Sequence, residues 1–402
     1  MILHKLGANL KALYESLGPE ECLGRLREGL SNGSLKPEHF SLREMAVSFC
    51  GYDWYNRLNP ANIGRFYQMP DRPLTEAGEA VDVSAFSNIT GQILYTKIMD
   101  GWKRTTADAE RLCSEEQTMF DGEKIPWLAN LTPGSLKLRP GQPYPQTSFG
   151  ERYIETPSTD KYGEICSVTK EMIFFDRTGQ ALRSANQVGE DLGYRKAKQI
   201  FDTVLGIDNS YKLNGSSYNT YLASGGWVNM LGSWPLNDWT SVNKVYELAA
   251  NNLDPDTGIP IEFDVNTLFV MPARVMHARR VISATSTVTN VGGFATSGNL
   301  QRFEAGNPLD PLEVITSKLA FQRLLYNGGG SAITQTNGIE YWYVGDFKKA
   351  FVYRYNWPIT VVQAPPNNQK DFEQDIVVQV KGSERGVISV DEPRCVFKFY
   401  NA

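Results

Sequence analysis

Apolar and polar residues follow two different periods between residues 163 and 205. Over 164–176 they alternate, which is the pattern of a strand, with an apolar side made of Val168, Met172 and Phe174. After a break at 177–179, apolar residues recur at helical spacing: Leu182, Ala185, Gly189, Leu192, Ile200 and Val204. Gly206 stands where a helix C-cap belongs. The pattern predicts a strand that leads into a helix of roughly 26 residues, about 40 Å long.

The stretch before this strand differs in its proline content and in the length of its alternating runs. Residues 131–163 contain five prolines and short alternating pieces such as 136–139. Together with 164–176 they predict a two-stranded ribbon that extends from the rest of the chain and returns to it. Because such a ribbon is marginally stable in water by itself, we expect it to lie on a second domain or on another copy of the protein.

The N-terminal part of the chain predicts short helices separated by an irregular segment. Pro19 opens one helix, and Ser41 with Glu44 forms a capping-box pattern before another. Aromatic residues lie among prolines over 51–83, which is typical of an arm packed on another surface or of a loop that covers its own domain. Two further helices are predicted, at 84–102 and near 107–117.

The chain after the long helix predicts an α/β arrangement followed by strands. A helix is expected at 238–252, a buried strand at 267–271, and a second helix that begins with Pro272 at its first position. Strands are then predicted at 340–344, 351–356, 359–363, 376–381 and 386–390, with a turn at Gly382.

Composition and charge narrow the functional class. A length of 402 residues allows two or three domains, and a net charge of −5 provides no global basic field that would recruit nucleic acid. The five cysteines include no CxxC pair, so we expect buried reduced thiols rather than disulfides or a zinc site. No run approaches the roughly 18 apolar residues of a membrane span. The N-terminus lacks a signal-peptide pattern, so we expect synthesis in a reducing cytoplasm.

Residues with candidate chemistry are few. His277 is one of three histidines and lies mid-helix beside Arg279 and Arg280, where we interpret it as a core or surface residue. The glycine-rich run 327–331 lacks the lysine and helix start of a phosphate loop, and 254–258 lacks the spaced acids of an EF-hand. We therefore predict no catalytic residue, no metal site and no cofactor, and interpret the chain as a structural protein.

One cluster of cations lies on the predicted long helix and comprises Arg195, Lys196 and Lys198. On an otherwise acidic protein these side chains offer a surface for the phosphates of DNA. The alternative, which the pattern favours, is a solvated helix face or ion pairs between subunits.

The order of these elements resembles that of the tailed-phage major capsid proteins, which have the Hong Kong 97-type fold. The similarity is sharpest near the C-terminus, where Val344–Phe347 precedes an alternating run and Asp371–Phe372 introduces a long strand. Glu384–Arg385 then precedes a second strand, and Pro393 precedes a final apolar run. The resemblance covers about residues 70–402 and rests on the ordering of these motifs.

The resemblance implies an α+β fold with an N-arm, an extended β-hairpin (the E-loop), a long spine helix in a peripheral domain, and an α/β axial domain. It divides the chain into an N-terminal helical extension or arm (1–70), an N-arm with helices leading to the core (71–129), the E-loop (130–177), the spine helix (178–208), the axial domain (209–350) and a strand-rich return to the peripheral domain (351–402). The implied intersubunit contacts of the E-loop are Leu136, Lys137, Arg139, Tyr153 and Lys161. In such a fold the cation cluster of Arg195, Lys196 and Lys198 is the candidate surface for the lumen or DNA, beside the favoured alternative of a solvated face or ion pairs between subunits.

The implied function is self-assembly into the hexamers and pentamers of an icosahedral virion capsid that encloses double-stranded DNA. The implied partners are other copies of the chain, a scaffold, a portal, possible decoration proteins and non-specifically bound DNA, with no membrane and with synthesis in the host cytoplasm. An encapsulin-like nanocompartment shell is the alternative within the fold, although its members are usually shorter. A β-rich carbohydrate-binding or virion-attached protein is the alternative of another class, suggested by Trp227, Trp234 and Trp239.

Overall fold

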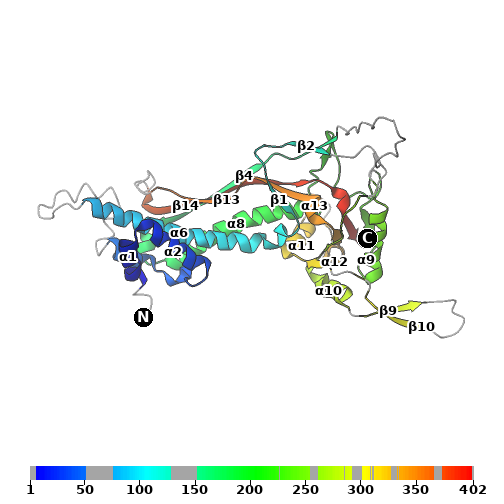
Figure 1. The fold of residues 1–402 in the computed structure, drawn as a ribbon, viewed down its shortest axis with the longest axis horizontal. Coiled ribbons are helices and arrows are strands. Elements are labelled where there is room, and N and C mark those ends of the chain that lie inside the picture. Colours follow the sequence, from blue (N-terminus) through cyan, green and yellow to red (C-terminus); the bar gives the residue numbers. More distant parts are fainter. Residues whose placement is uncertain are drawn as a thin grey trace, which may run out of the picture. The chain divides into compact units, whose positions relative to one another are not determined.

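The computed structural model describes residues 6–50, 76–127, 152–225, 227–253, 261–284, 286–291, 301–307, 309, 312–326, 333, 335–365 and 374–400. They form a chain of mixed helix and sheet (Figure 1). The chain divides into two compact units. Unit 1 comprises residues 1–106, 161–196 and 357–385, and unit 2 comprises 107–160, 197–356 and 386–402.

Unit 1 begins with a module of short helices: α1 (Leu6–Leu17), α2 (Pro19–Ser31), the 3-10 helix η2 (Pro37–His39) and α3 (Leu42–Cys50). Pro19 occupies the first turn of α2, as predicted. The Oγ atom of Ser41 accepts a hydrogen bond from the backbone N–H of Glu44 at 3.3 Å, so the predicted cap of the third helix is confirmed.

The helix α6 (Glu76–Glu110) is longer than the predicted helix at 84–102. The second predicted helix, near 107–117, is wrong, because α6 continues to Glu110 and the strand β1 (Ser114–Gln117) follows. Gly101 does not end the helix. Instead it provides space, since a Cβ atom there would come within 2.5 Å of the backbone oxygen of Asn186.

The strand predicted at 164–176 is correct only in its first half. Strand β4 (Asp160–Thr169) ends where the short helix α7 (Lys170–Phe174) begins, because the Oγ1 atom of Thr169 accepts a hydrogen bond from the backbone N–H of Met172 at 3.4 Å. This turn of helix buries Ile173 and leaves Phe174 exposed. The predicted long helix is confirmed as α8 (Thr178–Val204), followed by Gly206 with a φ angle of 71°.

Two long strands replace the four shorter strands predicted after residue 350. They are β13 (Phe351–Gln363) and β14 (Ile376–Val390), in a sheet with the order β1-β13-β14-β4. The turn predicted at Gly382 is wrong, because β14 runs through this residue. A Cβ atom at Gly382 would lie 2.9 Å from Cδ1 of Leu192, so the glycine here permits close packing of a helix on a strand.

Unit 2 contains a five-stranded sheet with the order β11-β8-β12-β15-β7. Its strands are β7 (Met230–Gly232), β8 (Thr267–Val270), β11 (Glu313–Ile315), β12 (Trp342–Gly345) and β15 (Val396–Tyr400). The helices of this unit include α9 (Trp239–Ala250), α10 (Val275–Ser283), α11 (Lys318–Leu325), α12 (Gln335–Ile339) and α13 (Phe347–Ala350), with 3-10 turns η4 (Pro272–Arg274) and η5 (Pro393–Cys395). The predicted α/β arrangement is therefore confirmed, with Pro272 opening the 3-10 turn before α10.

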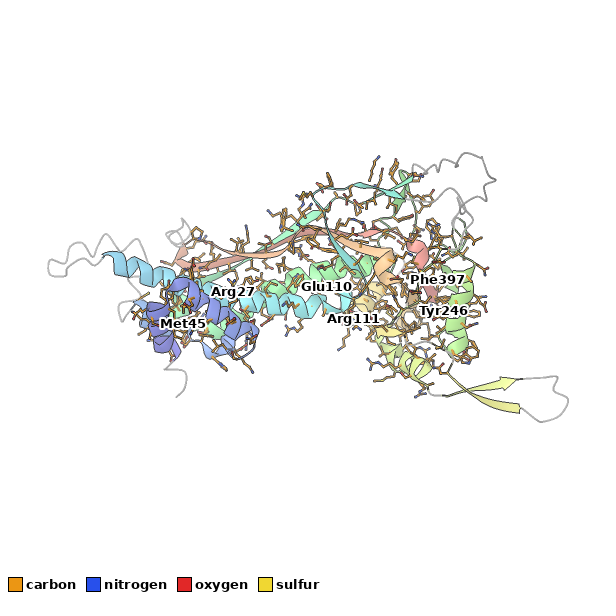
Figure 2. All side chains as sticks on the ribbon, viewed as in Figure 1. Arg27, Met45, Glu110, Arg111, Tyr246 and Phe397 are labelled. Carbon is orange, nitrogen blue, oxygen red and sulfur yellow. The ribbon has the colours of Figure 1, made fainter. Side chains whose placement is uncertain are left out.

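Apolar residues cover both faces of this sheet because alternate side chains enter different cores. In β12, Tyr343 belongs to one core, while Trp342 and Val344 belong to the other. The first core also contains the end of α8, and the second contains α9, α10 and Phe397 (Figure 2). Both faces are therefore buried, which explains the near-continuous apolar runs of these strands.

The remaining strands form two smaller sheets. A four-stranded sheet has the order β2-β3-β5-β6, with β2 (Lys124–Trp127), β3 (Arg152–Glu155), β5 (Lys212–Leu213) and β6 (Ser216–Ser217). The second is a two-stranded antiparallel sheet of β9 (Ser286–Val291) and β10 (Gln301–Gly306).

The N-terminal helices are part of the core of unit 1. Met45, which Figure 2 labels, belongs to one buried cluster with Ile93 of α6 and Leu182 of α8. Other members of this cluster from the first 50 residues are Leu10, Tyr14, Cys22, Leu26, Leu30, Phe40, Leu42, Ala46, Phe49 and Cys50. The described residues 6–50 therefore pack as a helical module in unit 1, and whether this module also acts as an arm between subunits stays a prediction.

The E-loop predicted at 130–177 is described only in part. Residues 152–177 contain β3, β4 and α7, and β3 pairs antiparallel with β2. Leu136, Lys137 and Arg139 lie outside the described residues. The division of the chain into peripheral and axial domains stays a prediction.

Candidate assembly surfaces

The long helices of unit 1 lie unusually close together where they cross. A Cβ atom on Gly189 of α8 would come within 2.0 Å of the backbone oxygen of Ile98 in α6. One turn later, a Cβ atom on Gly193 would lie 3.0 Å from the backbone oxygen of Trp102. Because the glycines remove the side chains that would separate the backbones, the two helices form a closely packed scaffold.

Lys196, one of the three residues of the cation cluster, is buried in unit 1 with a residue exposure of 5%. Its Nζ atom lies 4.0 Å from Oε1 of Glu384 and 4.8 Å from the ring centre of Trp102. The indole N–H of Trp102 donates to Oε2 of the same Glu384 at 3.4 Å. The expectation that Lys196 faces the lumen or DNA is therefore corrected, because a buried ammonium is not accessible to a phosphate.

The other two residues of the cation cluster are more exposed than Lys196. Arg195 is exposed, with its guanidinium 5.4 Å from the ring centre of Tyr162, and Lys198 is half-buried. For these two residues an orientation toward DNA stays a prediction.

A turn in unit 1 presents two aromatic rings to solvent. Phe174 and Phe175 at the end of α7 are both exposed. The carboxylate Oδ1 of Asp176, which has a φ angle of 48°, accepts hydrogen bonds from the hydroxyls of Ser41 at 2.9 Å and Thr178 at 2.8 Å. The N-terminal module thus helps to fix this turn. Exposed aromatic rings on a fixed backbone are typical of protein contact sites.

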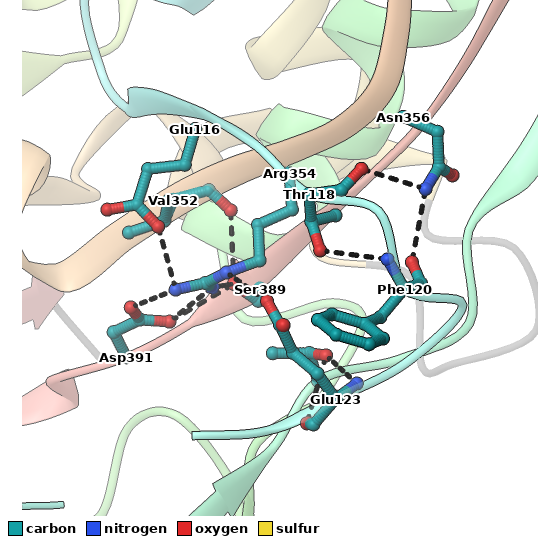
Figure 3. A network of polar contacts seen from close by, with 10 residues as sticks. Glu116, Thr118, Phe120, Glu123, Val352, Arg354, Asn356, Ser389 and Asp391 are labelled. Carbon is teal, nitrogen blue, oxygen red and sulfur yellow. Dashed lines mark hydrogen bonds and ion pairs between the residues drawn. The ribbon is translucent and has the colours of Figure 1, made fainter. Parts of the chain in front are cut away.

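A second fixed loop lies in unit 2 at residues 118–123, between β1 and β2. Arg354, a buried arginine of the neighbouring strand β13, holds this loop in place (Figure 3). The guanidinium makes two hydrogen bonds of 2.8 Å to the carboxylate of Asp391, which is a bidentate pair. It also donates to Glu116 at 3.2 Å and lies 3.6 Å from Glu123, so it joins the two ends of the loop.

The charge of Arg354 is maintained by these acids. Burial opposes the charged form, but the hydrogen bond to Asp391 and the neighbouring carboxylates outweigh it, so the pKa of Arg354 is raised. Sequence reasoning did not identify this residue. The available signal was a single arginine at a position within the apolar strand run 351–355, where a buried charge requires a partner.

The predicted E-loop contacts that the structure describes lie on two strands. Tyr153 of β3 is half-buried, and the Nζ atom of Lys124 lies 4.4 Å from its ring centre. Lys161 of β4 is exposed, and its Nζ atom lies 5.9 Å from the ring centre of Trp357. Whether these side chains contact another subunit stays a prediction.

A family model for phage capsid proteins matches residues 153–399, which is more than half of the chain. The chain belongs to the phage capsid protein family. Its predicted identity as a phage capsid protein, a structural protein of the virion, is thereby confirmed. The predicted α+β mixture of elements is confirmed as well, with the long helix α8 and the long strands β13 and β14.

Solved structures provide distant similarities to the capsid protein. The capsid of cyanophage P-SCSP1u is 13% identical, with a TM-score of 0.43, covering 72% of this chain and 86% of that one. Gordonia phage Cozz is 15% identical, with a TM-score of 0.40 and coverages of 73% and 86%. A virus-like particle from Pyrococcus furiosus is 10% identical, with a TM-score of 0.38 and coverages of 76% and 97%. No curated protein sequence matches the chain.

The cysteines of the capsid protein are buried free thiols, as predicted: Cys22, Cys50, Cys113, Cys166 and Cys395. Burial raises the pKa of Cys166 to about 11 and that of Cys395 to about 12, so both are protonated at neutral pH. Within the part of the chain that the structure describes, no group of histidines, cysteines and acids is arranged to hold a metal ion. No described helix is long and apolar enough to cross a membrane.

Proposed function

We propose that this capsid protein assembles with copies of itself into the hexamers and pentamers of an icosahedral shell that encloses double-stranded DNA. The proposal rests on family membership and on one observation: exposed apolar side chains stand on turns that side-chain hydrogen bonds fix. Phe174 and Phe175 in unit 1 and Met119 and Phe120 in unit 2 have this arrangement. A fixed apolar surface loses little entropy when a neighbour covers it, so it favours association.

The contacts in such a shell are heterologous, because one surface of each copy meets a different surface of the next. Heterologous contacts close into rings when the rotation between copies allows it. We assign the E-loop to this role, with Tyr153 and Lys161 beside Leu136, Lys137 and Arg139. We further assign residues 209–350 to an axial domain around the five-fold and six-fold axes, and 351–402 to the strand-rich return.

The proposed shell has further partners besides copies of the chain, and the enclosed DNA is the first of them. Arg195 and Lys198 are the predicted cations that remain available to DNA phosphates once Lys196 is excluded. A scaffold, a portal and decoration proteins are further proposed partners, and the host cytoplasm is the proposed place of synthesis.

Expression of the full chain, with and without the neighbouring genes of its source, followed by electron microscopy, tests the proposal. We expect closed shells with five-fold and six-fold capsomers, and nuclease-protected DNA in particles from infected cells. Shells that contain an enzyme cargo instead of DNA would support an encapsulin-like compartment. A monomer that stays unassembled at high concentration in light scattering, under all these conditions, would contradict the shell.

The three tryptophans provide no support for the carbohydrate-binding alternative. The ring N–H of Trp227 donates to the backbone oxygen of Thr220 at 3.5 Å, and that of Trp234 donates to Ser241 at 3.4 Å. Trp239 is half-buried at the start of α9. A sugar platform requires an open aromatic face, whereas these side chains are partly covered by their own chain.

A further inference from the structure

The loop 118–123 of unit 2 is fixed at nearly every residue. The side-chain amide of Asn356 donates to the backbone oxygens of Thr118 and Phe120, each at 3.1 Å (Figure 3). The carboxylate of Asp121 accepts from the backbone N–H of Thr159 at 2.8 Å and from its hydroxyl at 3.0 Å. With Arg354 joining Glu116 and Glu123, these bonds hold the loop in one conformation.

The tip of this fixed loop exposes two large apolar side chains. Met119 is 93% exposed and Phe120 is 63% exposed. Burying a side chain of this size is favourable, and the hydrogen bonds of the loop hold both side chains away from the cores of unit 2. A loop that is rigid and apolar at its tip has the properties of a binding anchor.

The surroundings of the tip are acidic. Glu115, Glu116 and Asp121 are exposed beside it, and Glu123 is half-buried. Arg354 is buried below the loop and shared among several carboxylates, and the exposed Lys124 after the loop pairs with Glu155 at 3.3 Å. The net accessible charge around the tip is therefore negative. A partner surface must therefore combine an apolar contact with positive charge.

The outer face of α10, also in unit 2, has this combination. Met276 is 75% exposed, and Arg279 and Arg280 follow it at the helical spacings of three and four residues. Both arginines are exposed, and neither has an ion-pair partner among the residues that the structure describes. Two other exposed arginines differ, since Arg177 stacks on Phe175 at 5.4 Å and Arg195 on Tyr162 at 5.4 Å. Arg43 and Arg183 of unit 1 are exposed without an ion pair among the described residues too, but neither has an exposed methionine at helical spacing before it.

We infer that the loop 118–123 of one copy docks on the outer face of α10 of a second copy, with Met119 and Phe120 against Met276 and the acidic rim against Arg279 and Arg280. This contact rests on the proposed self-assembly and names two surfaces that carry it. Because the loop and the helix are different surfaces of the same chain, the contact is heterologous and repeats from copy to copy.

Charge exchange between the two surfaces tests the contact. The variant R279E/R280E reverses the charge of the outer face of α10. The variant E115K/Q117K places two positive charges on exposed positions of β1 beside the loop and leaves Glu116 paired with Arg354. Each double variant is expected to lower the yield of sedimenting shells by roughly ten-fold or more, the effect of a loss of about 1.4 kcal/mol per contact. Combining all four changes is expected to restore the yield to within about three-fold of wild type.

Two further variants complete the test. M119S/F120S is expected to reduce shells to a similar extent without changing the thermal midpoint of the unassembled subunit, because both side chains are exposed. R25E/R27E reverses two exposed arginines of α2 and is expected to leave assembly unchanged.

The outcomes separate this contact from the proposed function. Normal shells from R279E/R280E, or no rescue by the four combined changes, overturn the contact while the shell-forming function stands. A wild-type chain that forms no shells under any of the conditions above overturns the proposed function and this contact with it.

Discussion

Gly189 of α8 faces the backbone oxygen of Ile98 in α6 so closely that a Cβ atom at position 189 would lie 2.0 Å from it. The nearest atoms are backbone atoms, so no side-chain rotation relieves the overlap. The long helices of unit 1 can approach to this distance only because position 189 has no side chain.

The variant Gly189→Ala is therefore expected to lower the free energy of unfolding of the capsid protein by roughly 1–3 kcal/mol, the range for overpacking. Guanidinium-induced unfolding of the unassembled subunit measures it. Gly24→Ala is the matched control, because Gly24 lies in α2 with no atom within 4 Å of the added Cβ, and it is expected to stabilise the protein by roughly 0.5–1 kcal/mol. Equal effects of the two substitutions would contradict the close crossing.

The buried pair of Lys196 and Glu384 leads to a second prediction. Removing one partner leaves the other charge buried, which costs roughly 3–5 kcal/mol. We expect Glu384→Gln to destabilise unit 1 by an amount near the lower end of that range, because the amide still accepts from the indole of Trp102. Differential scanning calorimetry measures the shift. Arg25→Gln, which removes an exposed i,i+4 pair with Glu21, is the control and is expected to change stability by less than about 0.5 kcal/mol.

Lys398 introduces a pH dependence in unit 2. Its Nζ atom donates to the backbone oxygen of Leu205 at 3.0 Å and lies between 5.3 and 5.7 Å from the ring centres of three tyrosines, Tyr221, Tyr341 and Tyr343. Burial lowers the pKa of Lys398 to about 8. The unfolded chain, with a lysine pKa of about 10.4, binds this proton more tightly than the folded protein above pH 8. Stability from this group therefore rises with pH, by up to about 1.4 kcal/mol per pH unit.

The surrounding tyrosines oppose this trend at higher pH. Burial raises the pKa of Tyr221, Tyr341 and Tyr343, so their contributions fall once the unfolded tyrosines ionise near pH 10. The informative window is therefore about pH 8–9.5. There we expect wild type to gain stability relative to Lys398→Met in urea titrations. A difference that stays constant with pH contradicts the prediction, and Lys348→Met, an exposed lysine, is the control.

Arg354 is expected to hold both the fold of unit 2 and the shape of the loop 118–123. Arg354→Met leaves Asp391, Glu116 and Glu123 facing one another without a cation, so we expect a loss of roughly 3 kcal/mol or more. Limited proteolysis is expected to cut the variant within 118–123, while wild type and the exposed-site control Arg43→Met resist. Unchanged cleavage in Arg354→Met would show that other bonds suffice to fix the loop.

The elements with a strong local signal were predictable from sequence. Each of these signals lies within a short segment of the sequence: the long apolar stripe of α8, the proline at the start of α2 and the cap at Ser41. Glycine was the main source of error. Gly382 was interpreted as a turn, yet it lies within β14 and provides space for Leu192, as Gly101 within α6 provides space for Asn186. A glycine signals a turn and a close approach equally well, and only the packed neighbour distinguishes the two.

The surfaces were less predictable because they depend on partners distant in sequence. Lys196 was grouped with Arg195 and Lys198 by proximity along the chain, but at about 100° per residue adjacent helical positions face different directions. It therefore faces Glu384, which is 188 residues away (384 − 196), while Arg195 is exposed. The network of Arg354 likewise joins β1, β13 and the end of β14, and no local pattern connects these segments.

The N-terminal module provides the last prediction, which asks whether residues 6–50 belong to the core or to an assembly arm. Met45 of α3 is 2% exposed and packs in the cluster of Ile93 and Leu182, whereas Leu13 of α1 is 42% exposed. Met45→Ala is expected to lower the free energy of unfolding by roughly 2–5 kcal/mol, and Leu13→Ala, the matched control, by less than about 1 kcal/mol. If Met45→Ala instead left unfolding of the subunit unchanged and reduced only the yield of shells, the module would act as an arm between subunits. The shared burial of α3, α6 and α8 predicts the opposite order, with subunit stability lost first.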